Sequence, residues 1–197
     1  AALHQAAKGV ERAPGVADAL LRQLRRALPH ITSARLLSRL AWALGKLGLS
    51  SPDVDAAVAH ICSVAPKALA KFTSQDLTNT LWGIARLREG VSRASAAGVA
   101  RLSQAIVRAC AQRVQELTAQ CLANSLWAVA RLRLRRELVR DFLGGCLREL
   151  GGSRDLRGFT TQGIANILWA LAELCAGGGA ADAARKESQA DRGTSAG

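Results

Sequence analysis

Amide and basic side chains recur along the chain at a spacing that suits contact with a nucleic acid. Gln75, Asn79 and Arg86 stand four and seven residues apart, which places all three on one face of an α-helix. Gln and Asn amides can pair with base edges, and an Arg guanidinium can bind phosphate or stack on a base. The matching sets are Gln120, Asn124 and Arg131; Gln162, Asn166 and Glu173; and Arg35, Arg39 and Lys46.

The near-constancy of these amides leaves a second interpretation open. Side chains that read a sequence should differ between units unless the target is repetitive, but Gln and Asn recur unchanged in three sets. The Asn side chains could instead bond the backbone of the next unit, and we favour that structural role for them. Specificity would then rest on variable positions, namely Ser38, Thr78, Ala123, Ala165 and the set Lys46, Arg86, Arg131 and Glu173.

Arginines also cluster where these predicted helices end. The recurrence of such clusters predicts a line of positive charge suited to a phosphate backbone. Cations are favoured at helix C-termini by the helix dipole as well, which would explain the same cluster without RNA. We call this set the basic rim: Arg86 and Arg88 in one unit, with Arg131, Arg133, Arg135 and Arg136 in the next.

The overall charge favours an anionic partner, and no motif indicates catalysis. Formal net charge is +12, a bias most often linked to nucleic acid. We find no Gly-rich phosphate loop and no Ser or Cys with a nearby His in a known motif. The 5 cysteines are odd in number and form no C-x-x-C pair, so neither a zinc site nor a disulfide framework is predicted. We expect no enzyme, no cofactor and no metal.

Four tryptophans mark a repeat in the sequence. Trp42, Trp82, Trp127 and Trp169 follow one another at spacings of 40, 45 and 42 residues. Around them the chain reads LLSRLAWALGKLG, DLTNTLWGIARLR, CLANSLWAVARLR and GIANILWALAELC. Apolar residues recur at helical spacing in each segment. Because the tryptophans never vary and fall within this apolar pattern, we interpret them as core residues rather than stacking platforms.

The segments begin with helix-start signals. Thr73 is a predicted N-cap, and Asp76 three residues on completes a capping box. Phe72 before the cap can pack on Leu77, and the same pairing recurs for Leu117 with Leu122 and for Phe159 with Ile164. A second helix should follow each Trp helix, the third of these being interrupted by Gly144 and Gly145.

These signals divide the chain into three parts. Residues 1–30 are expected to hold a truncated preceding repeat, with its second helix at about 14–28. Residues 31–176 form the array, with Trp helices at about 32–47, 73–89, 118–133 and 160–175. The Gly-, Ala- and Ser-rich tail at 177–197 is expected to be disordered. Helix pairs expose apolar surface above and below, so they are stable only when stacked. The predicted fold is therefore an all-α, right-handed α-solenoid of armadillo or HEAT type.

The repeat pattern F-x-x-Q-x-L-A-N-x-L-W-A-x-A-x-L resembles the octotricopeptide-type repeats of organellar RNA-binding proteins. It is also similar to the repeats that precede the RAP domain in FAST-kinase-domain proteins, and to helical subunits of the RNA-editing substrate-binding complex. The resemblance covers roughly Ile31 to Cys175. The first copy departs from the pattern, with Arg39 in the Asn place and Ala41 before Trp42.

The resemblance implies a module that binds single-stranded RNA in a mitochondrion or plastid. Its role would be RNA processing, stability, editing or ribosomal RNA maturation, with other proteins of a ribonucleoprotein complex as further partners. No membrane or small-molecule substrate is expected. The alternative is a protein-interaction scaffold of the armadillo or HEAT type. The candidate RNA-binding residues are Lys46, Gln75, Thr78, Asn79, Arg86, Arg88, Gln120, Asn124, Arg131, Arg133, Arg135, Arg136, Gln162 and Asn166.

Overall fold

The computed structural model describes residues 14–153 and 156–176. Within these ranges every regular element is a helix, which confirms the predicted all-helical class. The predicted tail at 177–197 lies outside the described residues. The longer helices are α2 (Pro14–Ala27), α3 (Ala34–Leu47), α4 (Pro52–Ala68), α5 (Ser74–Leu87), α6 (Arg93–Gln112), α7 (Ala119–Leu132), α8 (Arg136–Arg148) and a helix over 161–176.

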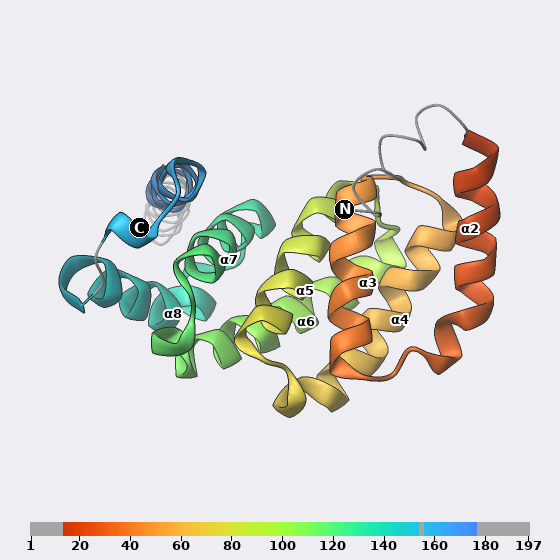
Figure 1. Cartoon of the computed structure of the whole chain (residues 1–197), viewed down its shortest axis with the longest axis horizontal. Helices are drawn as coiled ribbons and strands as arrows, with labels where there is room; N and C mark the ends of the chain where they lie inside the picture. Colours follow the sequence, from red (N-terminus) through yellow and green to blue (C-terminus); the bar gives the residue numbers. More distant parts are fainter. Residues whose placement is uncertain (1–13, 154–155, 177–197) are drawn as a thin grey trace, which may run out of the picture.

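The helices stack in two layers. In one layer α3 packs on α5 and α5 packs on α7, and in the other α2, α4, α6 and α8 pack in the same order. The 161–176 helix extends the first layer, because its Trp169 ring lies against Trp127 of α7. We call α3, α5, α7 and the 161–176 helix the Trp helices. Figure 1 shows the stack progressing from α2 at one end to the 161–176 helix at the other.

Side-chain caps fix where the Trp helices begin. In α5 the Thr73 hydroxyl accepts from the backbone N–H of Asp76, and the Asp76 carboxylate accepts from the N–H of Thr73. This confirms the predicted capping box, which satisfies two N–H groups that the helix leaves without partners. Thr118 of α7 and Thr160 of the 161–176 helix make the first of these two bonds, with the hydroxyl accepting from the N–H of Cys121 and of Gly163, respectively. In the first copy the cap is Ser33, since one extra residue follows Thr32.

The second-layer helices follow the predicted order, with one difference. We expected Gly144 and Gly145 to interrupt the helix after α7, but α8 runs through both. A glycine inside a helix costs only about 1 kcal/mol, and buried neighbours offset that cost. Phe142 and Cys146 on either side of the pair are both buried.

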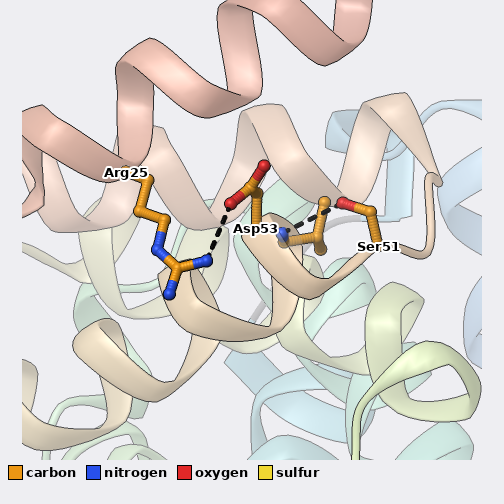
Figure 2. Close-up of polar contacts among 4 residues, drawn as sticks. Arg25, Ser51 and Asp53 are labelled. Atoms are coloured by element: carbon orange, nitrogen blue, oxygen red, sulfur yellow. Dashed lines mark hydrogen bonds and ion pairs between the residues drawn. The ribbon is translucent and has the colours of Figure 1, made fainter.

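Polar contacts connect successive second-layer helices at their starts. Ser51 caps α4 by accepting from the N–H of Val54, and Arg25 of α2 reaches Asp53 in the same turn at 3.2 Å (Figure 2). One unit later, Asp55 of α4 accepts from the N–H and the hydroxyl of Ser92, the residue that caps α6. The starts of α4 and α6 are thus each held by the preceding helix of their layer.

Two glycines let α3 and α5 approach closely. A Cβ on Gly83 would overlap the backbone carbonyl of Ala41, and a Cβ on Gly45 would lie 2.8 Å from the Cα of Gly83. No larger residue fits between the two backbones without moving them. The contact sets the spacing between the first two Trp helices, and therefore between Trp42 and Trp82.

Candidate nucleic-acid interface

One face of each Trp helix carries four side chains of the candidate site. In α5 these are Gln75, Asn79, Trp82 and Arg86, at successive spacings of four, three and four residues, which align them along a single helix face. Gln75 and Arg86 are exposed, and Asn79 and Trp82 are half-buried. We call the combined surface the Trp face. Its other members are Arg35, Arg39, Trp42 and Lys46; Gln120, Asn124, Trp127 and Arg131; and Gln162, Asn166, Trp169 and Glu173.

The indole rings form a row across the helices. The ring centroids of Trp82 and Trp127 are 6.2 Å apart with planes tilted by 34°, and those of Trp127 and Trp169 are 6.2 Å apart with a tilt of 35°. Trp42, Trp82 and Trp127 are half-buried, and Trp169 is exposed. The interpretation of these residues as core is therefore wrong in part. The rings lie over the core, but the stacked packing leaves part of each at the surface.

Cations lie against the first rings of this row. Lys46 Nζ is 5.9 Å from the ring centroid of Trp42 and 5.4 Å from that of Trp82. The Arg86 guanidinium is 5.8 Å from the Trp82 centroid, and its Nε donates to the Gly45 carbonyl at 3.4 Å. These distances suit cation–π attraction. Lys46 and Arg86 are thereby placed beside an aromatic surface, an arrangement that can hold both a phosphate and a base.

The recurring amides bond within their own helices. Gln75 Nε2 donates to Asn79 Oδ1 at 2.9 Å, and Gln162 Nε2 donates to Asn166 Oδ1 at 2.9 Å. The favoured interpretation, in which Asn bonds the backbone of the next unit, is therefore wrong at these two positions. The contact between units comes from Gln75 instead, whose Oε1 accepts from the Cys121 thiol at 3.3 Å. Asn79 and Asn166 are each held through the amide oxygen by the Gln one turn earlier, which leaves the NH2 group as the donor that could reach a ligand.

Thr78 cannot read a base, so its selection as an RNA-binding residue is wrong. Its side chain is fully buried, where its hydroxyl donates to the Ser74 carbonyl and lies 3.2 Å from the Ser125 hydroxyl of α7. The variable positions Ser38 and Ala123 are fully buried as well. Their variation reflects packing between neighbouring Trp helices rather than recognition of a ligand.

The basic rim is partly occupied by contacts within the protein. Arg131 Nη2 pairs with Glu89 Oε1 at 2.8 Å, and Arg88 Nη1 donates to the Arg131 carbonyl at 2.8 Å. Arg88 and Glu89 belong to η3 (Arg88–Gly90), the 3-10 turn after α5. These two arginines therefore connect one unit to the next, although both remain exposed.

The remaining rim residues lie at the junction of α7 and α8. Arg133 ends α7 with φ of 50°, in the left-handed region, and Arg135 is the residue before α8. Both side chains are exposed. The side chain of Arg136, the first residue of α8, lies outside the part of the chain that the structure describes.

An open hollow lies beside the Trp face, where α3 and α5 begin and α4 ends. Its volume is about 1040 Å³, at the upper end of the range of ligand sites. Its lining includes the Trp-face residues Gln75 and Asn79 together with one carboxylate, that of Asp76. Four basic side chains also line it, namely Arg35 and Arg39 of α3, Lys67 of α4, and Lys71 of η2 (Leu69–Lys71).

The carboxylate in the hollow is occupied by internal bonds. Asp76 accepts from the Ser38 hydroxyl at 2.6 Å and from the Thr73 hydroxyl at 2.7 Å. Burial alone would raise the pKa of Asp76, but these hydrogen bonds and the charge of Arg35 lower it. Asp76 is therefore ionised at neutral pH and offsets only one of the four cations around the hollow.

Comparisons with protein-family models, curated proteins and solved structures found no significant match. Among the described residues no cluster of His, Cys, Asp or Glu could hold a metal ion, and no helix is long and apolar enough to cross a membrane. Burial raises the pKa of the Cys110 thiol to about 12, so this cysteine stays protonated and is a poor nucleophile.

Two parts of the site were missed or only half recognised in the sequence. Trp82 lies three residues after Asn79 and four before Arg86, so the spacing that aligned the polar residues also placed the ring on their face. Lys67 and Lys71 lie at the end of α4 and in the turn that precedes α5, so they are close in sequence to Gln75 but 32 residues after Arg35 and Arg39, respectively. Only the packing of the helices brings these two lysines beside the arginines of α3 in the hollow.

Proposed function

We propose that the protein binds single-stranded RNA along the Trp face. One observation carries the proposal: each Trp helix presents two polar side chains, an indole ring and a charged residue in register, and the rings of Trp82, Trp127 and Trp169 pack against one another in a row. Proteins that bind single strands combine aromatic platforms for bases with a basic surface for the backbone. The net charge of +12 supports the same partner.

The finer assignments belong to this proposal. The stack is a right-handed α-solenoid, and its repeat resembles those of octotricopeptide-type proteins. By that resemblance it acts in RNA processing, stability, editing or ribosomal RNA maturation in a mitochondrion or plastid, alongside other proteins of a ribonucleoprotein complex. Chemistry on the RNA would come from those partners, because the Trp face offers amides, indoles and fixed charges.

Fluorescence provides a direct test, because all 4 tryptophans of the chain lie on the Trp face. Titration with single-stranded RNA should quench the intrinsic tryptophan emission as bases stack on the exposed ring surfaces. Polarisation of a labelled RNA should give the same affinity. Replacing Lys46 and Arg86 by Ala should weaken binding more than replacing Arg101 and Arg108, two exposed residues of α6 in the other layer. Equal weakening by the two double variants would remove the Trp face from the binding site.

A protein-interaction scaffold is the second candidate, favoured by apolar surface at the ends of the described stack. Leu168 is 64% exposed on the 161–176 helix, and Leu20 is 57% exposed on α2. Terminal units of stacked repeats ordinarily present a polar outer face, so these surfaces suit an apolar partner. Absence of RNA binding and of quenching at low salt would place this function first.

A further inference from the structure

The first Trp helix differs in chemistry from the others at the positions that face the hollow. Gln75 and Asn79 of α5 are neutral amides, and the matching residues of α3 are Arg35 and Arg39. All four side chains line the same hollow. The amides that recur along the Trp face are therefore replaced at α3 by two guanidinium groups, those of Arg35 and Arg39. Amides suit base edges, whereas guanidinium groups suit the paired oxygens of a phosphate.

The second layer adds two further cations at this point. Lys67 lies in the last turn of α4 and Lys71 in the η2 turn that follows it, and both are exposed. Partial negative charge at the C-terminus of α4 favours Lys67 there in any case. It does not explain why two basic residues of α3 line the same space. Three elements converge with four cations around one carboxylate, Asp76, whose oxygens already accept bonds from Ser38 and Thr73.

We propose that this hollow is a phosphate-binding site that holds backbone phosphates of the strand lying on the Trp face. The proposal rests on the proposed function, because it names where that strand is anchored. The first turn of α3 also lines the hollow, and N–H groups at the start of a helix favour anions. Binding here is independent of sequence, and the amides of the later units contact bases.

The experiment compares two ligands and three charge variants. The ligands are a single-stranded RNA 12-mer and an abasic ribose-phosphate 12-mer, which carries the same backbone without bases. The test variant is Lys67→Ala/Lys71→Ala, whose side chains lie outside the Trp-face rows. The matched control is Arg101→Ala/Arg108→Ala, which removes the same charge from α6. A third variant, Lys67→Arg/Lys71→Arg, keeps the charge in place. Circular dichroism should confirm equal helicity in all of them.

The parent should bind both oligomers, and the Lys67→Ala/Lys71→Ala variant should bind both roughly tenfold more weakly at low salt. Its plot of log affinity against log salt should be shallower by about 1.4 units, because two phosphate contacts contribute about 0.7 each. The α6 control should keep the parental slope, and the Arg variant should keep the parental affinity.

The outcomes separate this site from the proposed function. Equal slopes for the Lys67→Ala/Lys71→Ala variant and the α6 control would overturn the phosphate site while leaving RNA binding intact. If RNA binds no more tightly than the abasic oligomer and tryptophan emission is unchanged, the Trp face does not contact bases. A specific loss of abasic binding in the Lys67→Ala/Lys71→Ala variant would still support the hollow in that case. Inorganic phosphate should displace the abasic oligomer no more than a chloride solution of the same ionic strength does. If phosphate displaced more oligomer than chloride, the hollow would instead be a site for free phosphate.

Discussion

At the scale of single residues, the spacing between the tryptophan rings of the Trp face depends on two glycines that lie between the helix backbones and not on that face. The Lys46 amine lies between the Trp42 and Trp82 rings because α3 and α5 approach closely. That approach requires hydrogen in place of a side chain at Gly83 and Gly45. A glycine with no side chain of its own therefore sets the position of a cation on the Trp face.

Replacing Gly83 by Ala should destabilise the protein. The new Cβ would overlap the Ala41 carbonyl, so the two backbones must separate, at a cost of about 1–3 kcal/mol typical of overpacking. The gain in helix propensity of up to about 1 kcal/mol does not offset this. Urea unfolding measures the change in the free energy of unfolding.

Gly144→Ala is the matched control, since among the described residues the nearest neighbour of its Cβ would be a terminal nitrogen of the flexible Arg148 side chain, at 3.6 Å. There the propensity gain is unopposed, and unfolding should require the same or more urea than in the parent. If Gly83→Ala proved as stable as Gly144→Ala, the close contact of α3 and α5 would not hold in solution.

At the scale of elements, carboxylates connect successive helices within each layer. Asp76 of α5 accepts from Ser38 of α3, and Asp55 of α4 accepts from Ser92 before α6. Burial raises the pKa of each carboxyl, but both pKa values lie below the ordinary 3.8 because other effects outweigh it. For Asp55 these are hydrogen bonds from Ser92 and Ser95, and for Asp76 they are hydrogen bonds from Ser38 and Thr73 with the charge of Arg35. Both carboxylates are therefore better accommodated in the folded state when they are ionised.

This difference predicts a loss of stability in acid. A carboxyl whose folded pKa is lowered contributes its stabilisation fully above the unfolded value, and loses it as pH falls through the folded value. Between about pH 5 and pH 3 the parent should therefore lose more stability than Asp76→Asn, because the amide cannot titrate. Urea midpoints measured across that range for both proteins give the comparison. If the urea midpoints of the parent and of Asp76→Asn fell in parallel with pH, the Ser38 contact would not favour ionised Asp76.

The helices were predictable from local pattern, and the polar contacts between them were not. Thr73 and Asp76 form a capping box three residues apart, so the sequence alone defines it. The pairing of Thr78 with Ser125 joins residues 47 apart, and it depends on how α5 and α7 pack. The sequence pattern therefore predicts a base-reading role for Thr78 although its side chain is buried. Lys67 and Lys71 were missed for the same reason, because their neighbours come from α3 and α5.

At the scale of the whole molecule, positive charge lies along both edges of the Trp face. The hollow lies where α3 and α5 begin, and the basic rim lies where the Trp helices end. The α5 and α7 helices have 14 residues each, so the two edges are separated by about 21 Å. A strand that runs across the helices along one edge cannot contact the other edge at the same unit. The two sets of charges therefore mark alternative paths, unless the strand crosses the row of indole rings between them.

The salt dependence of binding should show which edge the strand follows. If the rim contacts the backbone, replacing Arg133 and Arg135 should make the slope of log affinity against log salt shallower by about 1.4 units. Arg133 is best replaced by Gly, because its φ of 50° is strained for a residue with a side chain. Arg133→Gly/Arg135→Ala should then remain as stable as the parent. The Arg101/Arg108 pair of α6 again provides the control for charge. A slope unchanged by the rim variant, with a shallower slope for Lys67→Ala/Lys71→Ala, would place the strand on the hollow edge. A shallower slope in the rim variant alone would place the strand on the rim edge. Shallower slopes in both the rim variant and the Lys67→Ala/Lys71→Ala variant would require a strand that crosses the row of indole rings.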